Sequence, residues 1–597
     1  MKLHKYKWYD PVLLPILCTP MFSVLRILLM IATDVLPVIQ VGVSSMLINR
    51  AIVLLQVGTW NELRMPLVLL GGIIFMTFMG QVISDLLEEK ICCQIRKNYG
   101  EFVIRKCASL PYAKIEEEKG WNLICRIKES ADKKILKGFK SYIGLIGIAI
   151  QTIGILLILF HYVWWLAIII TVISIVVMQF AIKSGETQYE VEKDNTTDTR
   201  LYHYIGDLLV GRDNVGEKKI FNYVSFLQNK WGVIFFKAKN KEKKVVIDNM
   251  IRMKMISILM SSIMFIAALF MIPFVTDGRI TVGLYIALVQ AIENLTSLMS
   301  WDLADDINDY SKYKEYVKDV VAFYNLPEID GARSLPNKQN IIIEKIEFKN
   351  VSFRYPNTEK LILNHISFTL EKGKHYSLVG TNGAGKTTLI KLIIGLYSEF
   401  EGEIFVNEKS IREYRQDELK AMYAVLFQDY ACYEISIRDN IALGDIRCMD
   451  SNIQDKRIKQ AINLLELDQK IESLPMKEKT KLGKLEYGGE HLSGGEEQRI
   501  AMARVVNSPA SMLILDEPTA ALDPISESKL YEQFDKISKD RTTIFISHRL
   551  GSTWLADEII VMNQGNIVQQ GPHMQLMKEC ELYKTMYEEQ RSWYNEM

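Results

Sequence analysis

The feature that most constrains the fold is an uncharged run of 42 residues, from residue 141 to residue 182, that contains no Asp, Glu, Lys or Arg. A helix needs about 20 apolar residues to cross the ~30 Å hydrocarbon core of a membrane, so this run suffices for two crossings. Its middle contains His161, Tyr162, Trp164 and Trp165. Aromatic side chains of this kind favour the membrane–water interface. The run therefore predicts two membrane spans joined by a tight turn.

Four more segments have the composition of membrane spans. Residues 65–84 and 255–276 contain no charged side chain, residues 21–49 contain only Arg26 and Asp34, and residues 280–301 contain only Glu293. The alternative, six helices buried in a soluble protein, fits poorly because soluble helices keep a polar face. The predicted all-α transmembrane domain of six helices occupies residues 1–326. Its spans are residues 21–50, 64–87, 139–161, 163–184, 251–276 and 280–302.

The links between the spans predict the orientation. The links at residues 85–140 and 183–254 are long and carry 13 and 14 Lys or Arg residues, whereas the other links are short and carry almost no Lys or Arg. Positive charge marks the cytoplasmic side of a membrane. We therefore expect a multi-pass protein in the lipid bilayer of the cytoplasmic membrane, with both termini and both long links in the cytoplasm.

Composition excludes several classes of protein. The 71 Lys and Arg residues balance the 71 Asp and Glu residues, so nothing in the charge indicates a nucleic-acid partner. Aliphatic and aromatic residues are too plentiful for a disordered chain. Eight cysteines without zinc-ligand spacing predict free thiols in a reducing compartment.

The chain changes character after a turn-rich stretch. Residues 327–340 are predicted to be a linker, because residues 327–337 are rich in turn formers and lack periodicity. Strand-like alternation follows at residues 341–348 and 351–354, and then strand–turn–helix units. Residues 341–597 therefore predict a soluble α/β domain.

A glycine-rich segment lies between a strand-like run at residues 376–379 and a helix-like run at residues 389–396. It matches the P-loop pattern in the structural context that the pattern requires. Glycines let backbone N–H groups surround phosphate oxygens, and the helix N-terminus adds partial positive charge. We expect Lys386 at the β- and γ-phosphates of ATP and the Thr387 hydroxyl on Mg²⁺. The predicted ATP-binding segment is Gly380, Thr381, Asn382, Gly383, Ala384, Gly385, Lys386, Thr387 and Thr388.

A second motif is the apolar run at residues 512–515, which ends in Asp516 and Glu517. The ends of strands are where α/β sheets bind ligands. The carboxylate of Asp516 is suited to a place in the coordination shell of Mg²⁺. Glu517 suits a general base that orients water against the γ-phosphate.

The segment Leu492, Ser493, Gly494, Gly495 and Glu496 resembles the signature sequence of the ATP-binding cassette (ABC) superfamily. The resemblance covers essentially the whole chain and identifies residues 341–597 as a P-loop NTPase cassette. The commonest family residue at the Glu496 position is Gln. We expect this variant to be tolerated, because the Ser and Gly positions contact phosphate.

The resemblance also implies roles for residues that fall in the family's order. Tyr355 would stack on adenine, Gln428 would meet Mg²⁺ and the attacking water, and Asp523 would belong to the D-loop. His548 would contact the γ-phosphate. Together with Glu517 these residues imply an active ATPase, with ATP and Mg²⁺ as cofactors.

The family further implies an assembly. Its signature lies too far from its own P-loop to complete one site, so two cassettes must face each other. The chain resembles an exporter-type half-transporter, whose functional unit is a homodimer or a heterodimer with a second half-transporter. Coupling helices are expected near residues 111–121 and 214–226.

The substrate prediction rests on weaker resemblance. Residues 425–440, 516–524 and 217–221 resemble exporters of lantibiotics and other modified peptides. Only about 20 residues precede the first span, so we expect no peptidase domain there. An exporter of drugs or lipids remains the alternative, and an ATP-gated membrane regulator is a minor one.

Two carboxylates fall inside predicted spans, Asp34 in the first and Glu293 in the sixth. A charge in hydrocarbon costs at least ~2.5 kcal/mol and usually faces a cavity or a partner. One hypothesis is an acidic pathway for a cationic peptide. The alternative is solvation at the interface together with helix capping near Pro37.

Overall fold

The computed structural model describes residues 7, 9–57, 60–211, 215–337, 341–449, 451–484, 488–520, 522–538, 541–547 and 550–595. The chain forms two compact units. The helical unit consists of Met1–Ile104 and Leu123–Leu326, and the α/β unit consists of Arg105–Asn122 and Pro327–Met597.

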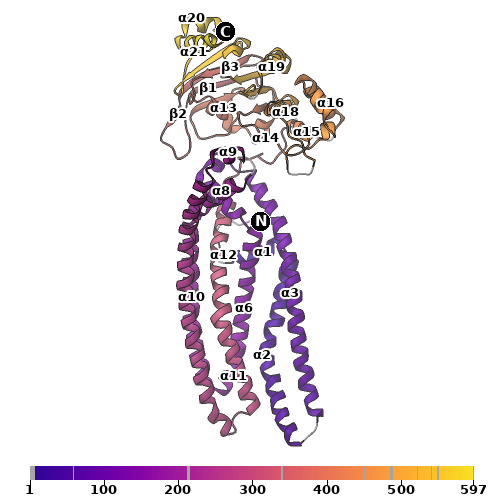
Figure 1. Ribbon diagram of the computed structural model, residues 1–597, viewed down its shortest axis with the longest axis vertical. Coiled ribbons are helices and arrows are strands. Elements are labelled where there is room, and N and C mark those ends of the chain that lie inside the picture. Colours follow the sequence, from indigo (N-terminus) through magenta and orange to yellow (C-terminus); the bar gives the residue numbers. More distant parts are fainter. Residues whose placement is uncertain are drawn as a thin grey trace. The chain divides into compact units, whose positions relative to one another are not determined.

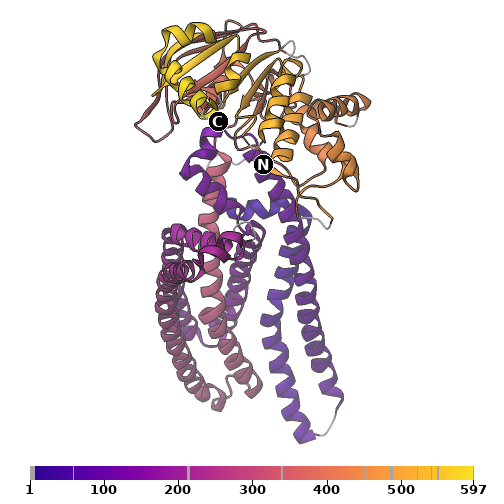
Figure 2. The same ribbon diagram turned by 45° about the horizontal axis from the view of Figure 1, so that its top comes forward.

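Long helices that run side by side make up the helical unit (Figures 1 and 2). Its helices are α1 (Asp10–Cys18), α2 (Pro20–Val57), α3 (Asn61–Cys107), α5 (Glu118–Lys128), α6 (Ala131–Tyr162), α7 (Trp164–Asp194), α8 (Thr196–Val210), α9 (Val215–Phe221), α10 (Val224–Thr276), α11 (Val282–Ser297) and α12 (Leu303–Tyr324). A π-helical turn, Leu298–Asp302, joins α11 to α12. The helices α3 and α5 each continue across the boundary into the α/β unit.

Among the described residues, four of these helices, α2, α3, α6 and α7, are long and apolar enough to cross a membrane. They contain the first four predicted spans. The predicted tight turn is confirmed, because only Val163 separates α6 from α7. The predicted spans 251–276 and 280–302 lie on α10, and on α11 with its π-helical turn. Within the described residues α10 contributes a shorter apolar helix, Ser261–Thr276, so these two spans stay predictions.

The helix α6 lies at the centre of the packing because small residues let its neighbours approach. A Cβ atom on Gly138 would lie 2.0 Å from the ring of Tyr313 in α12. A Cβ atom on Gly147 would lie 2.1 Å from the carboxylate of Asp34 in α2. Small residues at membrane helix interfaces permit this close contact.

The α/β unit contains two sheets. Its strands are β1 (Lys345–Arg354), β2 (Leu361–Glu371), β3 (His375–Gly380), β4 (Glu401–Val406), β5 (Lys409–Ser410), β6 (Tyr423–Leu426), β7 (Met512–Asp516), β8 (Thr542–Ile546), β9 (Glu558–Asn563) and β10 (Asn566–Gly571). The antiparallel sheet has the order β2-β1-β4-β5, and the larger sheet has the order β10-β9-β3-β8-β7-β6. All neighbours in the larger sheet are parallel except β10 and β9.

Helices flank the larger sheet, whose strands β7 and β8 are buried along their whole length. The α/β unit contains α4 (Tyr112–Glu116), α13 (Lys386–Ile393), α14 (Gln416–Met422), α15 (Ile437–Ala442), α16 (Asn452–Leu464), α17 (Asp468–Ser473), α18 (Gly494–Asn507), α19 (Pro524–Ile537), α20 (His573–Glu579) and α21 (Glu581–Asn595). Short helices α4 and α9 occur at the two predicted coupling positions, and their coupling role stays a prediction.

The prediction of two strands at the start of this unit is wrong, because one continuous strand, β1, begins at Lys345. A register irregularity between Phe348 and Val351 explains the error. Asn350 has a φ of 54°, in the left-handed region, and this local bulge interrupts the alternation of buried and exposed residues.

The segment 327–337, predicted as part of the linker, makes several contacts within the α/β unit. The Lys420 ammonium donates to the carbonyl of Ala332, and the backbone N–H of Asn337 donates to the carbonyl of Asp417. The Arg447 guanidinium donates to the carbonyl of Asn337 over 2.7 Å. Residues 338–340 lie outside the described residues, and the role of the whole segment as a linker stays a prediction.

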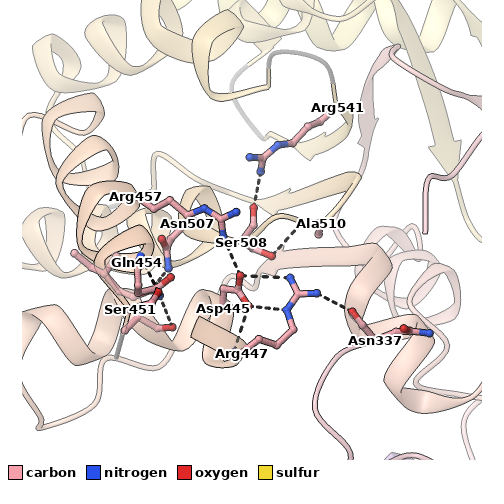
Figure 3. Close-up of polar contacts among 12 residues, drawn as sticks. Asn337, Asp445, Arg447, Ser451, Gln454, Arg457, Asn507, Ser508, Ala510 and Arg541 are labelled. Atoms are coloured by element: carbon pink, nitrogen blue, oxygen red, sulfur yellow. Dashed lines mark hydrogen bonds and ion pairs between the residues drawn. The ribbon is translucent and has the colours of Figure 1, made fainter. Parts of the chain in front are cut away.

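The buried carboxylate of Asp445 holds Arg447 in place (Figure 3). It accepts hydrogen bonds from Arg447 over 2.8 Å and from Arg457 over 2.9 Å. The Asp445 side chain is only 2% exposed, so its charge depends on these two guanidinium groups. The network therefore connects α16 and the segment after α15 to Asn337.

Candidate nucleotide-binding site

The predicted site residues gather at the carboxyl ends of neighbouring parallel strands. The P-loop follows β3, Gln428 follows β6, and Glu517 follows β7. β8 lies between β3 and β7, and β6 lies beside β7. Ligands bind at this end of parallel α/β sheets.

Glycines shape the P-loop. Gly383 and Gly385 have φ angles of 77° and 100°, which residues with a side chain rarely adopt. A Cβ atom on Gly380 would lie 2.2 Å from the carbonyl oxygen of Met562 in β9. The loop therefore lies directly against β9, and Thr381, Asn382 and Gly383 form its exposed rim.

Lys386 begins α13 and is almost completely buried, with 7% of its surface exposed. Its ammonium donates to the carbonyls of Gly380 over 2.8 Å and Thr381 over 3.2 Å, which folds the side chain back along the loop. Burial lowers the pKa of Lys386, although the charges of Glu517 and Asp516 act in the opposite direction. An anion at the loop would stabilise this buried cation.

Asp516 and Thr387 lie together beneath the loop. The Thr387 hydroxyl donates to Asp516 Oδ2 over 3.4 Å. Burial and the neighbouring charge of Glu517 raise the pKa of Asp516 to about 6. A pair of oxygen ligands beside excess negative charge fits a hard divalent cation, so the residues present are compatible with Mg²⁺.

Glu517 has an unusual backbone conformation, with a φ of 51°. Its N–H donates to the carbonyl of Ile546 in β8 over 3.1 Å, and its carbonyl accepts from Gln498 in α18 over 3.0 Å. Its carboxylate accepts from the Gln428 amide over 3.1 Å. Left-handed backbone at a non-glycine residue costs free energy, and contacts from three elements hold it here.

Tyr355 lies beside the P-loop helix. Its hydroxyl forms a 2.9 Å hydrogen bond with the Thr388 hydroxyl, which is buried in the first turn of α13. Its ring packs edge-on against Tyr397, with the ring centroids 5.7 Å apart. Tyr355 is half-buried, so it is not fully enclosed by the cassette.

The predicted signature segment forms the N-terminus of α18. The Ser493 hydroxyl accepts from the Glu496 N–H, and the Glu496 carboxylate accepts from the Ser493 N–H over 2.8 Å. This capping box requires Glu or Gln at its last position, which explains why Glu496 is compatible with the motif. Lys470 pairs with Glu496 over 3.2 Å, and the carbonyl of Gly494 accepts from Tyr430. Leu492 packs at the edge of a hydrophobic core, and Gly495 lies in the first helical turn.

The ABC transporter family matches residues 363–520, which contain the P-loop, the signature and the Asp516–Glu517 pair. The subtilin transport ATP-binding protein of Bacillus subtilis is 30% identical over 564 residues, covering 94% of this chain and 90% of that protein. The chain belongs to the ABC transporter family. As an ABC transporter, it is an ATPase whose activity is coupled to transport, and its cassette binds ATP.

Three further comparisons concern the transporter as a whole. The nisin transport ATP-binding protein of Lactococcus lactis is 27% identical over 537 residues, covering 86% of this chain and 87% of that protein. An ATP-dependent lipid A-core flippase of Shewanella denitrificans is 29% identical over 551 residues, covering 88% of this chain and 86% of that protein. The solved structure of a bacterial Atm1-family ABC exporter with ATP bound matches 95% of this chain and 97% of that chain. Its TM-score of 0.76 at 22% identity shows the exporter fold.

Four further predicted residues of this ABC transporter are not among the groups described so far. His548 lies outside the described residues. Asp523 is exposed, and its carboxylate accepts from the N–H of Ile525 at the start of α19. Asp34 accepts a 3.1 Å hydrogen bond from Gln151 of α6. Glu293, the other predicted membrane carboxylate, is exposed on α11.

The sequence analysis missed Tyr430, Lys470 and the contact that Gln498 makes with Glu517. Gln498 lies two positions after the signature segment, so its place along the chain was a usable signal. Tyr430 and Lys470 act through tertiary contacts with α18 that no local pattern indicates.

Proposed function

We propose that this ABC transporter exports a ribosomally made, modified peptide across the cytoplasmic membrane. The observation that carries the proposal is the 564-residue similarity to the subtilin transport protein. An alignment of that length must include the helical unit as well as the cassette. Substrate selection in a transporter depends on its membrane helices, so similarity there supports a similar class of substrate.

Hydrolysis in this proposal relies on the cassette residues described above. The P-loop N–H groups and Lys386 bind the triphosphate, and the Tyr355 ring stacks on adenine. Gln428 orients the Glu517 carboxylate, which accepts the proton of the attacking water. Thr387, Asp516 and Gln428 would hold Mg²⁺, which neutralises phosphate charge when it is bound. His548 would contact the γ-phosphate.

The assembly in this proposal is a homodimer in which each signature acts on the partner's nucleotide. The capping box fixes the hydroxyl of Ser493 at the start of α18, where helix N-terminal N–H groups favour phosphate. Ser493 and Gly495 then close the site from the opposite side. A heterodimer with a second half-transporter is the alternative, and mixed dimers can test the arrangement in trans.

We further propose that both termini and the cassette are cytoplasmic, as the charge of the two long links favours. ATP-driven closure of paired cassettes would move the helical units between inward-open and outward-open states. Asp34 would contribute negative charge to the pathway for a cationic peptide. Glu293 would add a second negative charge to this pathway from α11.

A lipid or drug exporter is the second candidate, and one structural observation favours it. The helical unit contains an apolar cavity of ≈ 510 Å³ between α6, α7 and α12. Its wall includes Leu145, Ile153, Ile175, Met178 and Met299. Such a wall suits acyl chains or hydrophobic drugs better than a strongly cationic peptide. The similarity to the lipid A-core flippase points the same way.

The test is the ATPase activity of the purified protein in lipid nanodiscs, titrated with cationic modified peptides, lipid A and hydrophobic drugs. Stimulation by one peptide class alone supports the peptide proposal. Stimulation by lipid A or by many unrelated compounds contradicts it and favours the second candidate. Glu517→Gln provides the background rate, and Asp34→Asn tests whether peptide stimulation needs the membrane carboxylate.

A further inference from the structure

A cluster of aromatic and charged side chains connects the first long link to the nucleotide site. The segment Arg105–Asn122 of that link belongs to the α/β unit. Within it, α4 carries Tyr112 and Glu116. Both residues contact the end of α13, the helix that begins with the P-loop lysine.

Glu116 accepts hydrogen bonds from three other side chains of this cluster. Its Oε1 accepts from Lys391 over 3.0 Å and also from the Tyr112 hydroxyl, and its Oε2 accepts from the Tyr397 hydroxyl. Lys391 has only 16% of its side chain exposed, so it depends on Glu116 for charge compensation. The hydrogen bonds and the charge of Lys391 lower the pKa of Glu116 despite the opposing effect of burial, which keeps the carboxylate ionised.

Two of the three partners of Glu116, Lys391 and Tyr397, lie against Tyr355. The Lys391 ammonium lies 5.8 Å from the centroid of the Tyr355 ring and 5.1 Å from that of Tyr112. The Tyr397 ring packs edge-on against both Tyr355 and Tyr112, with its centroid 5.7 Å and 5.5 Å from theirs. The Tyr355 hydroxyl is bonded to Thr388 at its far end. These contacts leave the ring little freedom to turn.

We propose that Glu116 positions the Tyr355 ring for adenine by holding Lys391 and Tyr397 against it. Glu116 is thus a positioning residue, contributed to the nucleotide site by the first long link. The inference rests on the proposed ATP site, because it assumes that Tyr355 stacks on the base. The triphosphate contacts of Lys386 and Thr387 do not involve this cluster, so the effect on binding is confined to the base.

The experiment measures equilibrium binding of ATP and of inorganic tripolyphosphate, both with Mg²⁺, to the full-length protein in nanodiscs. Glu116→Gln keeps the size of the side chain but removes its charge. We expect its Kd for ATP to rise about three- to tenfold, because the Lys391 cation–π contact and the stacking of the Tyr355 ring on adenine are both weakened. Its Kd for tripolyphosphate should not change. We also expect KM for ATP to rise while kcat at saturating ATP is unchanged.

The matched control is Glu118→Gln, the same exchange at an exposed position of the same segment. It should bind both ligands as the unaltered protein does. In the Tyr355→Ala background, Glu116→Gln should cause no further loss of ATP affinity, because the two residues act through one contact. Tyr397→Phe keeps the ring but removes its bond to Glu116, and it should weaken ATP binding in the same direction.

Unchanged ATP affinity in Glu116→Gln would overturn the proposal. Equal losses for ATP and tripolyphosphate would also overturn it, because they indicate general damage to the cassette. If Tyr355→Ala itself binds ATP normally, the assignment of Tyr355 in the proposed ATP site has failed. If Tyr355→Ala loses affinity but Glu116→Gln does not, only the positioning role has failed.

Discussion

The side-chain amide of Gln428 donates a 3.1 Å hydrogen bond to the carboxylate of Glu517, although 89 positions separate these residues in the chain. Each residue follows a strand, and the two strands, β6 and β7, are parallel neighbours. The residue predicted to meet the attacking water is therefore bonded to the residue predicted to accept its proton. A shift of either loop would change the orientation of the carboxylate.

This relationship makes Glu517 the sharpest test of the catalytic assignment. Glu517→Gln keeps the shape of the side chain but removes the base. We expect ATP to bind and the hydrolysis rate to fall by about 100- to 10,000-fold, the usual contribution of general base catalysis. Rates of phosphate release and retention of radiolabelled ATP measure the two effects.

The control for this variant is Glu532→Gln, the same exchange at an exposed position of α19. It should hydrolyse ATP at the normal rate. Rapid turnover by Glu517→Gln would show that another group activates the water.

The raised pKa of Asp516, about 6, predicts that the folded protein becomes less stable as the pH rises and this carboxyl group ionises. Burial and the charge of Glu517 disfavour the ionised form, so between about pH 4 and pH 6 the folded protein binds more protons than the unfolded chain. The free energy of unfolding therefore falls as pH rises through this window. At pH 7.5, without nucleotide or Mg²⁺, we expect Asp516→Asn to raise the free energy of unfolding by about 1–3 kcal/mol.

Thermal unfolding across the pH range measures this effect. The gain in the free energy of unfolding from Asp516→Asn should disappear below about pH 4, where the Asp side chain is as neutral as the Asn that replaces it. A midpoint at pH 7.5 that equals that of the unaltered protein would contradict the prediction. The same variant should lose Mg²⁺-dependent hydrolysis, so stability and activity should change in opposite directions.

Much of the nucleotide site could be predicted because its motifs are local. Gly380, Lys386 and Thr387 lie within one short segment, and its strand–turn–helix context fixes where the loop must be. The observed β3 and α13 agree with that prediction, although α13 starts three residues before the predicted run because Lys386 already lies in its first turn.

Tertiary contacts explain what could not be predicted. No pattern near Glu116 indicates that it meets Lys391, which lies 275 positions away. The segment 327–337 is turn-rich in sequence, yet Arg447 and Lys420 bind its carbonyls. The bulge at Asn350 depends on pairing with two different strands, so periodicity alone divided β1 into two.

The buried carboxylate of Asp445 predicts a large loss of stability on truncation. Asp445→Ala removes the carboxylate that the guanidinium groups of Arg447 and Arg457 share, and breaking a buried ion pair costs about 3 kcal/mol. The midpoint of thermal unfolding should fall by several degrees. Asp439→Ala is the control, since that side chain is 44% exposed and lies 3.8 Å from Arg438. Exposed pairs contribute about 0–1 kcal/mol, so equal losses in the two variants would contradict the prediction.

The proposed completion of each ATP site by the partner's signature predicts a specific result for mixed dimers. Lys386→Ala removes the triphosphate contact, and Ser493→Ala removes the capping hydroxyl of the signature, so each variant alone should be inactive. A dimer with one chain of each kind has one site with both defects and one site with neither. We therefore expect the co-purified mixed dimer to recover a substantial share of the normal hydrolysis rate. In a second mixed dimer, the double variant Lys386→Ala/Ser493→Ala is paired with the unaltered chain. Every site of that dimer has one defect, so it should be inactive. Activity in the second mixture but not in the first would show that each cassette completes its own site.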